Sequence, residues 1–369
     1  MSGDGNANSF FGGDGDDTLS GGAGNDILAG DGGADSLLGG DGNDLIEGGL
    51  GADYLNGGAG VDTISFANSN AAVYVNLNTG VVSGGHADGD TISGFEAVVG
   101  SAYTDTIIGG AGDEVLAFSG GSDSLDGGAG NDTISFAGAT SGVTFNIATG
   151  AVSGAGSIGA TASNFEAVVG SGFGDNIRLS SGDETVSGGG GQDVLSGGAG
   201  NDVLSGGADA DTLDGGAGND IVAGGGGADV LAGGAGEDTL DYSGSSSQVM
   251  VDLRSNAVSG GDADGDTISG FEHVSGTNFS KIFGNSGANN LDFGVGGQIY
   301  AKSGNDTLRG HKVLTGLGGH GDDTYIWDVD SAGSGWQFRV SEAKWQSGPG
   351  GYTYRLVRTS LSLRGMRRS

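Results

Sequence analysis

The 369-residue chain contains no cysteine and only one proline. Without cysteine, disulfides, thiolate metal sites and thiol nucleophiles are all excluded. No apolar run approaches the ~18 residues of a membrane-spanning helix. The first residues, MSGDGNANSFF, lack the basic and apolar regions of a cleavable signal peptide. We therefore expect no membrane span and no N-terminal export signal.

Positive charge is also scarce, and it is unevenly placed. Seven of the 13 bases but only one of the 47 acids lie in residues 331–369, so residues 1–330 hold 46 acids and six bases, a formal charge of −40. A body this acidic repels nucleic acid and anionic membranes and attracts cations. We expect no nucleic-acid partner. Hydrophobic residues make up only 35% of the chain, which argues against one thick core.

Glycine is abundant instead, with 86 residues, and it recurs with a period of nine. Collagen is excluded because glycine does not fall at every third residue. From Gly12 the chain divides into nonads such as GGDGDDTLS and GGAGNDILA, which run to Ser65. The same phase returns from Gly100 to Ser135 and from Gly170 to Asp241. The eighth residue of these nonads is always Leu, Ile or Val, and the sixth is always acidic.

We call these the sixth-position acids. They are Asp17, Asp26, Asp35, Asp44, Asp53, Asp62, Asp105, Glu114, Asp123, Asp132, Asp175, Glu184, Asp193, Asp202, Asp211, Asp220, Asp229 and Asp238.

A period of nine fits neither the 3.6-residue period of a helix nor a simple hairpin ladder. It predicts a six-residue glycine-rich turn followed by a strand of about three residues, whose eighth-position side chain points inward. One such unit cannot bury its apolar face alone, but stacked copies can. The sequence therefore predicts an all-β solenoid with a thin aliphatic core.

The nonads resemble the GGxGxDxUx repeat of RTX proteins, also called hemolysin-type calcium-binding repeats. The resemblance implies a right-handed parallel β-roll with two nonads per coil and calcium ions between the turns. It also implies that each sixth-position acid is a calcium ligand. Looser repeats occur at 3–11, 284–292, 301–309 and 318–326; they place Asn289, Asp306 and Asp323 in the acidic position, and we add Asp306 and Asp323 to the predicted ligands.

This arrangement explains why the chain tolerates so many like charges. With two nonads per coil, every second acid stacks on one edge, as Asp17, Asp35 and Asp53 do on one and Asp26 does on the other. Carboxylates on coils ~4.8 Å apart would repel by ~1 kcal/mol in water and about 3.5 kcal/mol at an effective dielectric of 20. A divalent cation between turns would turn this repulsion into binding. Oxygen donors without His or Cys select Ca²⁺, and flexible turns suit Mg²⁺ less well. The alternative is that these are merely solvated turn aspartates.

Three similar inserts interrupt the nonads at 66–99, 136–169 and 242–274. VYVNLNTGVVSGG in the first corresponds to VTFNIATGAVSGA and VMVDLRSNAVSGG in the others, and each has a Phe-Glu pair near its end. We interpret each insert as a wider β layer, with Phe95, Phe165 and Phe271 as core residues. DADGDTISGFE in the third insert begins like an EF-hand loop, but its Gly and Glu stand at the wrong positions. An auxiliary cation site in the first and third inserts stays open as an alternative.

No catalytic constellation stands out. The four histidines, at positions 86, 273, 311 and 320, form no HExxH motif, and there is no GxSxG or GxxxxGK[ST] sequence. The pairs Asp113–Glu114 and Asp183–Glu184 could suggest glycosidase carboxylates. They occupy the fifth and sixth positions of ordinary nonads, however, so calcium ligation explains them better. We expect no enzymatic activity.

The sequence thus predicts an RTX roll at 1–65, an insert at 66–99, a second roll at 100–135, an insert at 136–169, a third roll at 170–241, an insert at 242–274, degenerate repeats at 275–330 and a basic tail at 331–369, for which disorder is one option. We expect a monomeric, calcium-binding extracellular protein that folds on binding Ca²⁺. The resemblance implies the type I secretion machinery as a partner, although the basic tail is unusual for such a signal. Two alternatives are a calcium-stiffened adhesin or surface-layer segment, held at the cell surface, and a fragment of a β-helical polysaccharide-modifying enzyme.

Overall fold

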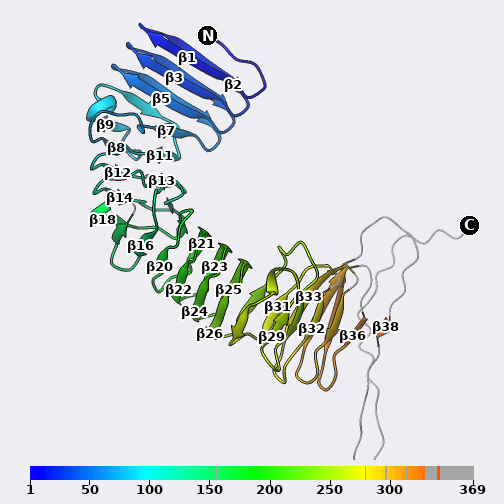
Figure 1. Ribbon diagram of the computed structural model, residues 1–369. Coiled ribbons are helices and arrows are strands. Elements are labelled where there is room, and N and C mark those ends of the chain that lie inside the picture. Colours follow the sequence, from blue (N-terminus) through cyan, green and yellow to red (C-terminus); the bar gives the residue numbers. More distant parts are fainter. Residues whose placement is uncertain (155–156, 279, 296, 312–314, 329–338, 341–369) are drawn as a thin grey trace, which may run out of the picture.

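The computed structural model describes residues 1–154, 157–278, 280–295, 297–311, 315–328 and 339–340. These residues form β-strands and two short 3-10 helices, and no helix among them is long and apolar enough to cross a membrane. The strands stack as the successive coils of a β-solenoid, whose path bends along its middle third (Figure 1). The predicted all-β solenoid is confirmed. The predicted basic tail lies outside the described residues, apart from 339–340.

One face of the solenoid is a single parallel sheet of sixteen strands. Its strands are, in order, β1 (Ser9–Asp14), β3 (Ile27–Gly32), β5 (Leu45–Leu50), β7 (Thr63–Ser65), β11 (Ala97–Val99), β13 (Val115–Ala117), β15 (Thr133–Ser135), β19 (Ala167–Val169), β21 (Thr185–Gly190), β23 (Val203–Ala208), β25 (Ile221–Gly226), β27 (Thr239–Asp241), β31 (His273–Ser275), β33 (Asn290–Val295), β35 (Thr307–His311) and β37 (Thr324–Asp328).

The opposite face is divided into three sheets. The first holds β2 (Thr18–Ala23), β4 (Ser36–Asp41), β6 (Tyr54–Ala59) and β10 (Thr91–Ser93). The second holds β9 (Val81–Ser83), β8 (Tyr74–Asn76), β12 (Thr106–Ile108), β14 (Ser124–Asp126), β18 (Ser157–Ser163), β17 (Ala151–Gly154), β16 (Val143–Asn146), β20 (Asn176–Arg178), β22 (Val194–Ala199), β24 (Thr212–Ala217), β26 (Val230–Ala235) and β30 (Thr267–Ser269). The third holds β29 (Ala257–Ser259), β28 (Met250–Asp252), β32 (Lys281–Phe283), β34 (Gln298–Tyr300), β36 (Thr315–Leu317) and β38 (Arg339–Val340).

Two nonads make one coil. Leu204 pairs with Val222 on one face, and Leu195 pairs with Leu213 on the other, so each strand lies beside the strand one coil, or two nonads, further along the chain. The eighth-position residues are fully buried and form the stacked core, whereas the seventh-position residues point outward. The inward direction predicted for position eight is confirmed.

Strand length separates two parts of the solenoid. We call β1–β6 (residues 9–59) the first array and β21–β26 (residues 185–235) the second array; their strands have six residues. The nonad strands between them, within residues 97–178, have three. The prediction of three-residue strands throughout is therefore wrong for the arrays. In the arrays the pairing between strands continues into the start of the next nonad, where Gly207 of one strand pairs with Gly225 of its neighbour. Both residues have positive φ values, which suit glycine.

The inserts differ in whether they interrupt the sheets on the face opposite the sixteen-stranded sheet. The first and third each form a short antiparallel hairpin, β8–β9 and β28–β29, followed by a 3-10 turn, η1 (Gly85–Ala87) or η2 (Gly261–Ala263). At both, the old sheet ends and a new one begins. In the second insert, β16, β17 and β18 are antiparallel and keep the sheet continuous. The three insert phenylalanines are buried, as predicted.

The stacked core predicts a sharp difference between neighbouring side chains. Leu204 is 0% exposed and Val203 is 39% exposed. We expect Leu204→Ala to lower the free energy of unfolding by about 2–5 kcal/mol, because it leaves a cavity in a core with one aliphatic residue per strand. Val203→Ala should change it by less than about 0.5 kcal/mol. Urea unfolding followed by circular dichroism in one fixed buffer checks both, and equal losses would contradict the assignment of the core.

Candidate metal centre

Nearly all sixth-position acids are buried where the turn enters the strand. Asp17 and Asp323 are half-buried, and the others, with Asp306, are 0% to 7% exposed. The acid directly precedes the strand whose next inward residue is the eighth-position aliphatic, so the same alternation that buries Leu204 also draws Asp202 inward. The solenoid therefore buries a large number of carboxyl groups.

Backbone hydrogen bonds hold one oxygen of each buried carboxylate. The N–H of Asp193 donates to Oδ1 of Asp211 at 2.8 Å, and the N–H of Asp211 donates to Oδ1 of Asp229 at 2.9 Å. The same bond joins Asp202 to Asp220 at 2.8 Å. Apart from Asp17, Glu114 and Glu184, each sixth-position acid thus accepts a hydrogen bond from the coil before it. The acids form two columns, one along each edge of the solenoid.

In many nonads the second carboxylate oxygen has no partner. This oxygen is buried and accepts no hydrogen bond, a costly state for a polar atom. We call a sixth-position acid in this state an open carboxylate. The open carboxylates are Asp26, Asp35, Asp44, Asp53, Asp62, Asp132, Asp193, Asp202, Asp211, Asp220, Asp229, Asp238 and Asp306.

Each open oxygen lies beside the backbone of a position-one glycine, except in Asp306, whose nonad begins with Ala301. A Cβ atom placed on Gly215, the first residue of its nonad, would lie 2.5 Å from Oδ2 of Asp220 and 2.5 Å from the carbonyl oxygen of Gly233. A side chain at that position would fill the space beside the carboxylate. Glycine at position one therefore keeps a cradle open between a carboxylate oxygen and the backbone carbonyl of the next coil.

Burial and neighbouring charges make these carboxylates poor anions. The pKa of Asp211 is raised to about 7, chiefly by burial and then by the negative charges of Asp193 and Asp229. Burial likewise raises the pKa of Asp193 and of Asp202 to about 6. It is also the largest cause of the raised pKa values of Asp44 and Asp62 in the first array. An ionised carboxylate in these columns therefore carries a negative charge that its buried surroundings stabilise poorly.

The donor set fits Ca²⁺. The open groups are hard carboxylate oxygens beside backbone carbonyls, the ligands that Ca²⁺ uses in sites of six to eight oxygens. Within the described part of the chain, no group of three or more His, Cys, Asp or Glu side chains could hold a metal ion by itself. An ion in the cradle would therefore need backbone carbonyl oxygens in addition to a carboxylate.

The comparison with known families agrees with this geometry. The model of the RTX calcium-binding nonapeptide repeat matches residues 2–37, 30–64, 85–125, 119–138, 169–204, 178–213 and 205–240, which together cover more than half of the chain. The chain belongs to the RTX calcium-binding repeat family. Membership supports calcium binding by its repeats. No curated protein shows significant similarity to the chain.

Not every RTX nonad of this chain has an open carboxylate. Asp105 accepts the N–H of Ser101 at Oδ2 (2.6 Å) and the Ser101 hydroxyl at Oδ1 (2.6 Å). Asp175 is bonded in the same way by Ser171, at 2.6 Å and 2.8 Å. We call such acids, whose oxygens are satisfied by the N–H or O–H groups of the protein, capped carboxylates. The sequence prediction treated them as equal to the others.

The structure also adds acids to the columns that the sequence prediction left out. The N–H of Asp53 donates to Oδ1 of Asp90 at 2.9 Å, and the N–H of Asp229 donates to Oδ1 of Asp266 at 2.9 Å. Both lie in inserts, as the sixth residues of GHADGDTIS (85–93) and GDADGDTIS (261–269). These nonads are out of phase with those before them, which hid them from a search in fixed phase. The family match that begins at residue 85 detects the first.

Glutamates continue the other column through the inserts. Glu96, Glu166 and Glu272 accept the N–H groups of Asp62, Asp132 and Asp238 at 3.0, 2.9 and 3.1 Å. Each lies 34 residues after the aspartate that it binds, a constant spacing that could have located them from the sequence. Asn289 takes the acidic position of its nonad: its side-chain amide donates to the carbonyl of Glu272 at 2.8 Å, and its Oδ1 accepts the N–H of Asn285 of its own turn at 3.0 Å.

The raised pKa values predict a pH response of the metal-free protein. In the folded state these carboxyls hold protons up to about pH 6–7, whereas unfolded ones release them near pH 4. The folded state therefore binds more protons between these limits, and its stability falls as pH rises through that window. In calcium-stripped buffer we expect acidification from pH 7 to pH 5 to increase the β signal in circular dichroism. A constant or falling signal would contradict these pKa directions.

Proposed function

We propose that this RTX protein binds calcium ions in the cradles of its open carboxylates, and that binding drives the folding of its repeats. One observation carries the proposal: the columns of buried Oδ2 atoms that have no hydrogen-bond partner in the protein. A divalent cation that these oxygens bind would remove both the cost of an unsatisfied polar atom and the repulsion along the column.

The chain's own groups prepare each site. In the second array the N–H of Asp202 fixes the orientation of Asp220 through Oδ1, which leaves Oδ2 directed to the cradle. Glycine at position one, such as Gly215, keeps the cradle clear. Calcium, when bound, supplies the positive charge that this acidic body lacks. The eighth-position residues then stack as a core that the repulsion no longer opposes.

Folding that is coupled to calcium binding suits a protein that is exported before it folds. Where calcium is scarce, a charge of −40 on residues 1–330 favours an expanded chain. At ~10⁻⁴–10⁻³ M calcium, the affinity range of extracellular modules, the repeats would order. We propose on this basis that the protein is a secreted monomer that acts outside the cell, with the type I secretion machinery as its export partner.

Exchange of two carboxylates for amides tests the ligand assignment. Asp202→Asn together with Asp220→Asn keeps an acceptor at Oδ1 but replaces the open oxygen on two neighbouring coils of one column. We expect about tenfold weaker calcium binding, ~1.4 kcal/mol, and a shallower titration, measured by calorimetry.

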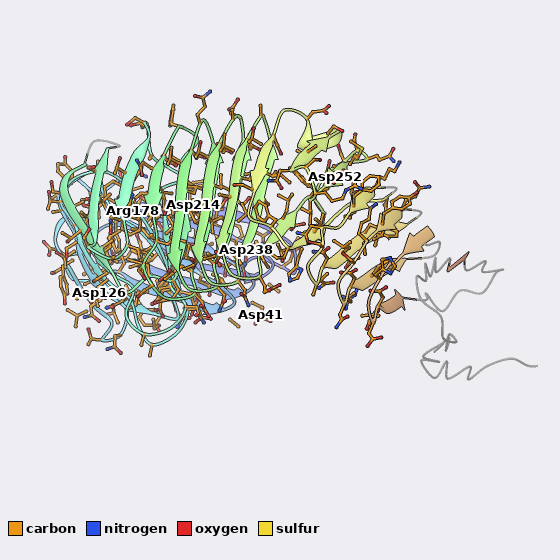
Figure 2. All side chains as sticks on the ribbon, turned by 90° about the horizontal axis from the view of Figure 1, so that it is seen from below. Asp41, Asp126, Arg178, Asp214, Asp238 and Asp252 are labelled. Carbon is orange, nitrogen blue, oxygen red and sulfur yellow. The ribbon has the colours of Figure 1, made fainter. Side chains whose placement is uncertain are left out.

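The control is Asp14→Asn with Asp214→Asn, which removes the same charge from exposed strand positions; Figure 2 labels Asp214. The control should titrate as the unmodified protein does. If both double variants lost the same affinity, the effect would come from net charge, and the ligand assignment would be wrong.

A further inference from the structure

Apart from Asp17 and Asp123, the sixth-position acids of the consensus nonads form two groups that the repeat consensus does not separate. Open carboxylates have a buried oxygen with no partner, and capped carboxylates have both oxygens within reach of N–H or O–H donors of the protein. The two groups also differ in place. Open carboxylates predominate in both arrays, whereas the capped sixth-position acids lie in the first two nonads after the first and second inserts.

The backbone at position two of the nonad distinguishes the open aspartates of the arrays from Asp105 and Asp175. In the arrays this residue has a positive φ, as Gly207 does at +114°, and its backbone pairs with the next coil. Ser101 and Ser171 are not among the residues with positive φ. Their N–H groups point instead to the carboxylate of their own nonad, at 2.6 Å in both cases.

The two sixth-position glutamates are capped as well. The longer side chain of Glu114 reaches its own turn and accepts the N–H of Gly110 at 2.8 Å and that of Gly112 at 3.2 Å. Glu184 accepts the hydroxyl of Ser180 and the N–H of Gly182. Hydrogen bonds to a charged group are stronger than those between neutral groups, so these acids are stabilised without an ion.

The acids Asp90 and Asp266 of the inserts also differ as open and capped carboxylates, and the capping donor here is a tyrosine hydroxyl. Oδ2 of Asp266 accepts the hydroxyl of Tyr242 at 2.6 Å, whereas Oδ2 of Asp90 is buried without a partner. The residue that corresponds to Tyr242 in the first insert is Phe66, which has no hydroxyl. Asp53, whose N–H binds Asp90, is itself an open carboxylate and is 2% exposed. Asp90 therefore continues the first array, and Asp266 ends the second.

The segment between the arrays has a second source of stability. Phe118, Phe136 and Phe145 are buried there, with ring centroids 5.6 Å and 5.5 Å apart. Aromatic side chains bury about 150–250 Å² each, much more than the single aliphatic residue that each array strand contributes. The antiparallel strands of the second insert extend the same core, since Phe145 lies on β16.

We propose that calcium binds only the open carboxylates, with Asp90 as an additional ligand, and that Asp105, Glu114, Asp175, Glu184 and Asp266 bind none. Residues 97–178 then form a calcium-independent segment that joins two calcium-dependent arrays. Asp132 is open within this segment, but its column neighbour Glu114 is capped, so the fold of the segment rests on its caps and aromatic core. The inference rests on the proposed function and refines its list of ligands.

Hydrogen–deuterium exchange of the full chain, followed by mass spectrometry, tests this division. We expect amides of residues 27–50 and 203–226 to exchange at least about tenfold faster in chelator than in ~2 mM CaCl₂, a concentration above the usual affinity range of extracellular calcium-binding modules. Amides of residues 106–117 and 143–147 should be protected in both. If all four segments responded equally to calcium, the inference would be overturned and the proposed function would stand. If none responded, both would be overturned.

A serine exchange tests the cause of the capping. Ser101→Gly removes the hydroxyl cap and permits the positive φ of an array turn, so we expect residues 100–117 to become calcium-dependent in the same experiment. Ser181→Gly, at an exposed turn position, is the matched control and should leave their protection unchanged. Unchanged protection in Ser101→Gly, or an equal change in the control, would refute the role of the cap.

Ion counting tests the insert acids. Native mass spectrometry of the calcium-loaded protein should show one ion fewer for Asp90→Asn than for the unmodified chain. Asp266→Asn should show no loss, because Tyr242 already satisfies the oxygen it alters. Equal losses in the two variants, or no loss in Asp90→Asn, would overturn the assignment of Asp90.

Discussion

The solenoid depends on how the chain satisfies a buried carboxylate at the start of each strand. In most of the aspartates one oxygen is held by a backbone N–H of the preceding coil, as the N–H of Asp193 holds Asp211, and this bond links successive coils. The other oxygen is left to a cation in the arrays or to the protein's own donors elsewhere. Because the apolar core is thin, the stability of each coil depends on whether this second oxygen is satisfied, by a cation or by a donor of the protein.

Glycine serves this constraint at two positions of the nonad. At position one it leaves the space beside the carboxylate free, as Gly215 does. At position two it allows the positive φ that continues the strand to six residues, as Gly207 does. Where Ser101 or Ser171 takes position two, the preceding strand has three residues and the carboxylate accepts hydrogen bonds from its own turn. A single residue thus links local conformation, sheet pairing and the chemistry of the site.

Much of this could be predicted from the sequence, because the period of nine fixes the coil and its inward aliphatic residue. The phase of the repeat also placed the acids from Asp17 to Asp238 in two columns. Asp90 and Asp266 escaped because their nonads are out of phase with the earlier ones, and only strand pairing shows that Thr91 lies beside Tyr54. The caps at Asp105 and Asp175 escaped because the consensus records the acid and not the direction of a backbone N–H. The length of the array strands depended on pairing between glycines, which carries no side-chain signal.

The central claim is that calcium, and not cations in general, orders the repeats. Far-UV circular dichroism during a Ca²⁺ titration, with Mg²⁺ at equal ionic strength as the control, tests it most directly. The account predicts a cooperative gain of β signal with Ca²⁺ and little change with Mg²⁺, because Mg²⁺ demands a tighter octahedral site and retains its waters. A spectrum that is fully β-rich in chelator and unmoved by Ca²⁺ would contradict it.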